Sequence, residues 1–172
     1  KEVDRNRIGI LGICGWGGMA LNAASMDTRV KAVATSVMYD MSRAMGHGVG
    51  DGKDRYSTSD RRAVLQYLNA QRWKDAENGT FAHGGHDIYV DENGKVTAAE
   101  RILPEALPDN PNPVLKEFFD YYRMPRGFHA RSVNSTGAWT ATTPLAFMNM
   151  PLLSYDREIT IPTLIVTGEK PH

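Results

Sequence analysis

The stretch that decides the fold is RIGILGICGWGGMALNAA, residues 7–24. Its first part, 7–14, is short, rich in isoleucine and continuously apolar, which is typical of a parallel strand covered on both faces. Glycines then surround Trp16, and the residues that follow, up to Met26, are mostly good helix formers. The stretch therefore predicts a buried strand, a tight turn and a helix.

Two further apolar runs complete the predicted sheet. Residues 30–38, VKAVATSVM, are strand-like and follow the helix, so the three elements form a βαβ unit with parallel strands. Residues 163–167, TLIVT, lie between Pro162 and Gly168 and predict a third buried strand. The predicted fold class is α/β, with a parallel sheet flanked by helices.

The long segment between the second and third strands has a mostly helical pattern. It predicts one helix over 61–77, a hairpin over 88–97 around a turn sequence, and a short helix over 142–149. A further helix is predicted after Pro113, where four apolar side chains share the spacing of one buried stripe: Leu115, Phe118, Phe119 and Tyr122.

Composition excludes several classes of protein. The 172 residues carry 20 Lys+Arg and 20 Asp+Glu, which gives no basic surplus for a nucleic-acid partner. The single cysteine, Cys14, excludes a disulfide framework and a cysteine zinc cluster. The apolar runs are too short to span a membrane and no signal peptide opens the chain, so we expect a cytoplasmic protein. We expect no cofactor. We also expect no metal, because the His83–Asp87 stretch, HGGHD, is interpreted as a solvated loop.

A strand that turns sharply into a helix through glycines is the geometry of a nucleophile elbow. Small neighbours are needed there because the backbone of the nucleophile is strained, and the first amides of the helix can stabilise an oxyanion. The dinucleotide-binding turn is the alternative. It is disfavoured because the glycine spacing does not match, and Thr35-Ser36 stand where an acidic residue would bind the ribose.

Residues 7–24, together with RVKAVATSVMYDM at 29–41 and IPTLIVTGEK at 161–170, resemble the α/β-hydrolase superfamily, nearest its dienelactone-hydrolase-like branch. The resemblance implies that the three strands are the fifth, sixth and seventh of that fold. It implies a hydrolase core over 1–40 and 158–172 and a lid insertion over 41–157. It also implies that four earlier strands, one oxyanion-hole amide, and an eighth strand with the catalytic histidine lie outside this chain.

The elbow can be aligned with the family in two ways. Alignment on the paired glycines Gly17-Gly18 puts Trp16 at the nucleophile position, where an indole cannot attack a carbonyl. Alignment on Gly12-x-Cys14 makes the thiol the nucleophile, as in thiol-using dienelactone hydrolases, but leaves Trp16 where a small residue belongs. The two glycines favour the first alignment, and both remain open.

Most of the remaining site residues follow from the same resemblance. Relatives carry an aspartate shortly after strand seven, where this chain has Pro171, so Glu169 or Asp40 is expected to substitute as the acid. Gly17, at the start of the helix, is a candidate for substrate contact. Independently of the resemblance, an aromatic and basic cluster that includes Arg123, Arg126 and His129 is expected to line a pocket that faces the elbow, where Arg123 or Arg126 would orient an anion.

Two functions are therefore compared. The first is a hydrolase of a small-molecule ester or related acyl bond, with a degenerate elbow. The second is a non-catalytic protein that keeps the hydrolase fold for binding or interaction. The expected partner is a small-molecule substrate, with no nucleic acid and no membrane. Because the first strand would leave an open sheet edge, we also expect a homo-oligomer or pairing with the remainder of a longer chain.

Overall fold

The computed structural model describes residues 3–48, 55–84 and 87–169. Its internal contacts divide the chain into two compact units. The first unit comprises Lys1–Ala44 and Phe147–His172, and the second comprises Met45–Ala146. The first unit therefore assembles both outer parts of the sequence around one sheet.

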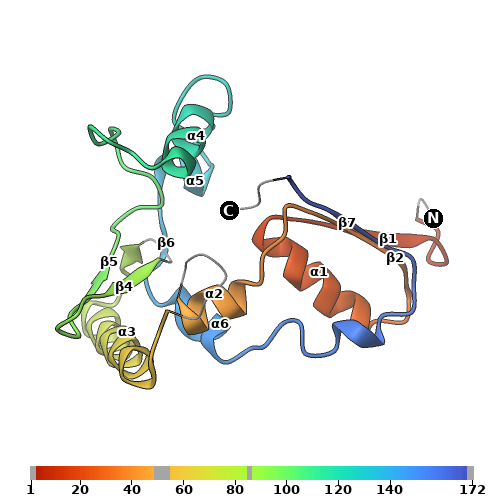
Figure 1. Cartoon of the computed structure of the whole chain (residues 1–172), viewed down its shortest axis with the longest axis horizontal. Helices are drawn as coiled ribbons and strands as arrows, with labels where there is room; N and C mark the ends of the chain where they lie inside the picture. Colours follow the sequence, from red (N-terminus) through yellow and green to blue (C-terminus); the bar gives the residue numbers. More distant parts are fainter. Residues whose placement is uncertain (1–2, 49–54, 85–86, 170–172) are drawn as a thin grey trace. The chain divides into compact units, whose positions relative to one another are not determined.

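A three-stranded parallel sheet with strand order β1-β2-β7 forms the first unit. Strand β1 spans Ile8–Ile13, β2 spans Val30–Ser36 and β7 spans Thr163–Val166. Helix α1, Gly15–Met26, connects β1 to β2 and lies along one face of the sheet (Figure 1). The prediction of parallel strands joined by a helix is confirmed.

The core of the first unit lies between α1 and the sheet. Ala20, Leu21 and Val33 are buried at its centre. Partly buried apolar side chains surround them: Ile10, Ala24, Met38, Leu153, Ile159 and Ile161. The last three belong to the segment that leads into β7, which contains the short 3-10 helix η1, Asp156–Glu158, in contact with α1. Burial of these side chains fixes α1 on the sheet.

The opposite face of the sheet is exposed. Leu11, Ala34 and Leu164 form one aligned row across the three strands, and Leu11 and Leu164 are 65% and 60% exposed. Ile13 and Val166 lie in the next row and are also exposed. The prediction that these strands are buried on both faces is therefore wrong for the part of the chain that the structure describes. A continuous apolar run does not reveal which of its two faces is covered.

Helix α3, Thr58–Asn78, confirms the helix predicted over 61–77. It begins earlier than predicted because Ser57 and Asp60 form a capping box, in which each side chain accepts from the backbone N–H of the other residue. It ends at Gly79, whose φ of 64° lies in the left-handed region that glycine adopts without strain.

The second unit contains two small antiparallel sheets of two short strands each. The predicted hairpin is confirmed as β4, Ile88–Val90, paired antiparallel with β5, Val96–Ala98. Strand β3, His83–Gly84, pairs antiparallel with β6, Trp139–Thr140.

The predicted helix after Pro113 is α4, Pro113–Tyr122, capped by the side chain of Asn112. The apolar stripe of α4 is not buried. No residue of the helix is fully buried, and Phe118 is 42% exposed. The prediction of a buried stripe is therefore wrong, although the spacing identified the helix itself. The remaining helices are α2, Met41–His47, α5, Val133–Thr136, and α6, Thr143–Met148. Within the described residues, no helix has both the length and the apolar character that a membrane crossing requires.

Candidate active site

Cys14 occupies the turn between β1 and α1. Its backbone has φ 57° and ψ −132°, a conformation that L-residues rarely adopt and that costs about 1–3 kcal/mol. Two hydrogen bonds hold the turn: the Cys14 N–H donates to the Ser36 carbonyl at 3.0 Å, and the Gly17 N–H donates to the Cys14 carbonyl at 2.9 Å. The Cys14 side chain is exposed and makes no capping hydrogen bond to the helix. The thiol therefore projects from a strained turn at the amino end of a twelve-residue helix.

Close packing explains why glycines surround this turn. A Cβ on Gly12 would lie 2.6 Å from the Trp16 carbonyl oxygen and 2.7 Å from both the Ala20 Cβ and the Gly17 Cα. Side chains at this position would push α1 off β1, because ordinary carbon contacts are about 3.5–4.0 Å. Gly12 thus permits the close crossing of strand and helix that forms the elbow.

Trp16 lies in the first turn of α1 and is 62% exposed. The strained residue is Cys14, so the backbone turns at Cys14 and not at Trp16. The paired glycines that favoured alignment on Trp16 have another cause: Gly17 is buried where a Cβ would clash with Met38, and a Cβ on Gly18 would lie 3.3 Å from the Tyr39 carbonyl oxygen. The pair therefore serves the packing of α1 against the chain after β2. A substrate contact of Gly17 stays a prediction.

A second strained residue, which the sequence analysis did not identify, stands beside the elbow. Val37 follows β2 and has φ 44°, an outlier for a β-branched residue. Its N–H donates to the Val166 carbonyl at the end of β7, at 2.8 Å. Neighbouring strands of the parallel sheet therefore both end in left-handed residues, Cys14 and Val37, at the carboxyl edge where α/β folds place their ligands.

Asp40 caps α2 in this structure. Its Oδ1 accepts hydrogen bonds from the Ser42 N–H at 2.9 Å and the Arg43 N–H at 3.1 Å, and also from the Ser42 hydroxyl. The Ser42 hydroxyl oxygen in turn accepts from the Leu152 N–H at 3.1 Å, within the same unit. One carboxylate oxygen of Asp40 is therefore engaged in a structural network.

Glu169, the other candidate acid, is exposed and lies shortly after β7. Because β1 and β7 run in the same direction, the chain beyond β7 leaves the sheet at the edge where Cys14 lies. Glu169 is therefore an exposed residue that follows β7 at the same edge of the sheet as Cys14.

Arg123, Arg126 and His129 belong to the second unit, where they have local partners. The Arg123 Nη1 donates to the Ser135 carbonyl, and the Arg126 guanidinium stacks 5.7 Å from the centre of the Tyr121 ring. The Nδ1 of exposed His129 accepts from the Arg131 N–H at 3.1 Å. The Arg123 guanidinium therefore already donates a hydrogen bond inside the second unit. The expected pocket that faces the elbow stays a prediction.

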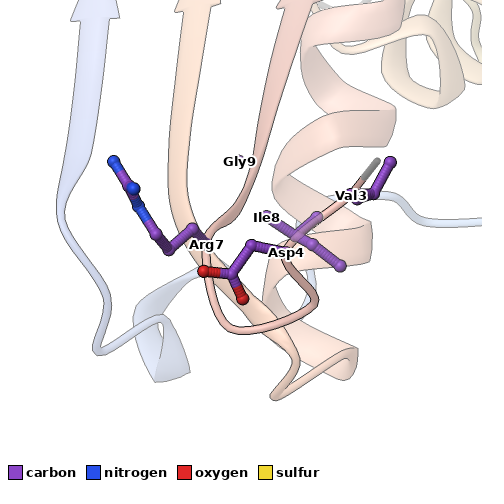
Figure 2. Close-up of a pocket in the computed structure, with 5 residues that line it drawn as sticks. All are labelled: Val3, Asp4, Arg7, Ile8 and Gly9. Atoms are coloured by element: carbon purple, nitrogen blue, oxygen red, sulfur yellow. The ribbon is translucent and has the colours of Figure 1, made fainter. Parts of the chain in front are cut away.

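Cys14 lines neither of two hollows in the surface of the described residues. One of about 450 Å³ is lined by Val3, Asp4, Arg7, Ile8 and Gly9. Figure 2 shows these residues at the turn before β1 and at the first two residues of the strand, which is the opposite end of β1 from the elbow. A second hollow, of about 410 Å³, lies in the second unit between residues 83 and 138, with Arg101, Arg131 and Glu100 in its lining.

Metal ligands do not gather in the described part of the chain. No group of three or more His, Cys, Asp or Glu side chains is placed there to hold a metal ion. In the His83–Asp87 stretch, His86 lies outside the described residues.

Three comparisons relate the chain to known proteins. No protein-family model matches it. It is 48% identical over 172 residues to the uncharacterised protein PA2218 of Pseudomonas aeruginosa. This match covers 99% of the present chain and 41% of PA2218. The chain is 26% identical over 174 residues to the uncharacterised protein YcjY of Escherichia coli, covering 98% of this chain and 48% of that protein.

The crystal structure of the hypothetical protein PA2218 superposes on this chain with a TM-score of 0.80 at 48% identity. The match covers 98% of this chain and 47% of that one. The chain therefore spans less than half the length of these relatives and has the fold of the matching part of PA2218. Neither relative has an assigned function, so an activity has to be inferred from the geometry of the elbow itself.

Proposed function

We propose that the protein hydrolyses an ester or related acyl bond of a small molecule, with Cys14 as the nucleophile. The observation that carries the proposal is the backbone of Cys14, a left-handed cysteine between a parallel strand and the first turn of a helix. Strain of this kind persists only where the surroundings enforce it, and it is concentrated at active sites. A buried structural cysteine would need neither the strained turn nor the exposure that Cys14 has.

The chemistry follows from the position of the thiol. The Cys14 Sγ, deprotonated by a base, attacks the carbonyl carbon of the ester, and the carbonyl electrons move onto the oxygen to give an oxyanion. Collapse of this intermediate breaks the bond to the alcohol, which takes up the proton, and leaves a thioester on Cys14. Water then cleaves the thioester, releasing the acid and the free thiol. The N–H of Gly15, the residue after the nucleophile, is the donor expected to stabilise the oxyanion in both steps.

The proposal takes the remaining parts of the machinery from the resemblance to the dienelactone-hydrolase-like branch. There the base is a histidine after an eighth strand, which residues 1–172 do not include. Of the two acids, we favour Glu169 as its partner, because Oδ1 of Asp40 is engaged in capping α2. The same resemblance implies that the second unit is the lid insertion of this fold.

The test uses protein that includes the segment with the expected histidine, and it compares the wild type with Cys14→Ala and with Trp16→Phe. We expect Cys14→Ala to lower the hydrolysis of small esters by at least about 10³-fold while the circular dichroism spectrum is unchanged. Trp16→Phe keeps an aromatic ring beside the elbow and should retain activity within about tenfold. Equal activity in wild-type and Cys14→Ala protein would contradict the proposal. Absence of any turnover in the wild type would favour the non-catalytic alternative.

A further inference from the structure

One peptide unit connects the end of β2 to the candidate nucleophile. The Ser36 carbonyl oxygen of this peptide accepts from the Cys14 N–H at 3.0 Å, and its N–H, which belongs to Val37, donates to the Val166 carbonyl at 2.8 Å. The peptide therefore joins the carboxyl ends of all three strands. It places the Val37 Cα within about 7 Å of the Cys14 Cα.

Three exposed apolar side chains stand at these strand ends. Ile13 is the last residue of β1 and precedes Cys14, Val37 follows β2, and Val166 is the last residue of β7. Ile13 and Val37 are each 54% exposed, and Val166 is 48% exposed. These three residues are named the apolar rim. They surround the end of β2, because Ile13 and Val166 pair with Ser36 from either side.

The segments that form this edge of the sheet carry no charged side chain. Residues 8–26, 32–39 and 159–168 contain no Asp, Glu, Lys, Arg or His. The charged residues that directly follow the last two segments are Asp40 and Glu169, and both are acidic. An anionic group of a substrate would therefore lose water at the rim without gaining a counter-charge from these segments, which is costly.

We propose that the acyl group of the ester that reacts with Cys14 is uncharged and apolar, and that it packs on the apolar rim. This inference rests on the proposed function and names its substrate class. Val37 is a specificity-determining residue, because one peptide fixes its backbone to both Cys14 and Val166. The expectation that Arg123 or Arg126 orients an anion predicts the opposite preference, so a comparison of charged and uncharged acyl groups decides between the two.

The test measures kcat/KM for aryl esters with five acyl groups, using protein that includes the segment with the expected histidine. The groups are acetyl, butyryl, hexanoyl, 5-methylhexanoyl and glutaryl. The last two have the same shape, but glutaryl ends in a carboxylate where 5-methylhexanoyl ends in two methyl groups. We expect kcat/KM to rise by about two- to fourfold per methylene from acetyl to hexanoyl. The 5-methylhexanoyl ester should exceed the glutaryl ester by at least about tenfold.

Val37→Thr tests the rim itself, because it keeps the β-branched shape and adds a hydroxyl group. We expect this variant to lower the hexanoyl-to-acetyl ratio of kcat/KM by at least about fivefold, since the hydroxyl loses water against the acyl chain. The matched control is Val3→Thr. Val3 is 74% exposed in the same unit and precedes β1, at the other end of the strand from the rim. Its ratio should equal that of the wild type, and melting temperatures show whether each variant folds.

Each failure has a separate meaning. A flat chain-length series, or a glutaryl ester hydrolysed as well as its uncharged counterpart, overturns the substrate class, while an inactive Cys14→Ala leaves the proposed function standing. An unchanged ratio in folded Val37→Thr overturns the role of Val37. If that variant changes only the sedimentation of the protein, the rim is a contact between copies of the chain and the proposal is wrong. If Val37→Thr does not fold, the wild-type series decides. If Cys14→Ala keeps its activity, both proposals fail.

Discussion

Replacement of Gly12 by alanine tests the close crossing of β1 and α1 on which the elbow depends. The new methyl group would lie 2.6–2.7 Å from three atoms, namely the Trp16 carbonyl oxygen, the Ala20 Cβ and the Gly17 Cα. Two of these are backbone atoms of α1, so no side-chain rotation relieves the overlap. To restore ordinary contacts, α1 would have to move away from β1 by about 1 Å.

The expected cost follows from this displacement. Overpacking of a core costs about 1–3 kcal/mol, and alanine returns about 0.4–1 kcal/mol by restricting the unfolded chain. We therefore expect Gly12→Ala to destabilise the first unit by about 1–2 kcal/mol. Gly9 is the matched control on the same strand, because a Cβ there would meet only the Ala32 carbonyl oxygen, at an ordinary 3.6 Å. Gly9→Ala should be neutral or slightly stabilising.

Native-state amide exchange of residues 8–13 measures the effect in the first unit alone. The free energy of opening should fall in Gly12→Ala and be unchanged or higher in Gly9→Ala. If both variants open with the wild-type free energy, the packing argument for the elbow is refuted. The packing argument is also refuted if Gly9→Ala lowers the free energy of opening more than Gly12→Ala does.

Two further predictions concern pH and association. Burial, and then the negative charge of Asp87, raises the pKa of Tyr56 to about 12. Because the folded-state pKa lies above the unfolded value of about 10, the stabilisation is complete below pH 10 and is lost as the pH rises toward 12. The melting temperature of the wild type should therefore fall more steeply between pH 10 and 12 than that of Tyr56→Phe, and parallel curves would contradict this. The exposed sheet face predicts concentration-dependent self-association, which Leu11→Lys with Leu164→Lys should abolish without unfolding the protein. Sedimentation of the wild type as a monomer at all concentrations would refute it.

Much of the fold could be predicted from local sequence. The apolar runs and the glycines between them were enough to place β1, α1, β2 and β7. These signals depend on patterns within a few residues, so they can be recognised without knowledge of the tertiary structure. Burial could not be predicted in the same way. The apolar runs of β1 and β7 and the stripe of α4 show only that the side chains are apolar, while their covering depends on elements distant in sequence.

At the candidate site, too, local features could be predicted from the sequence and tertiary contacts could not. The sequence located the elbow to residues 14–16 and favoured alignment on Trp16 over Cys14, because two adjacent glycines resemble those that follow a nucleophile. In the structure, Gly17 and Gly18 pack against Met38 and Tyr39, and no local pattern in the sequence reveals that contact. Val37 was missed because nothing about a valine in an apolar run indicates a positive φ.

The central claim is that Cys14 is the nucleophile of an acyl-transfer site, and the most direct measurement is the mass of the intermediate. The protein is mixed with an activated aryl ester, quenched in acid within seconds, and digested for peptide mass spectrometry. The account predicts one acyl group, bound as a thioester on the peptide that contains Cys14 and removed by hydroxylamine. It also predicts that the adduct is absent from Cys14→Ala. Turnover of the ester with no adduct on Cys14, or with an adduct on another residue, would contradict the account.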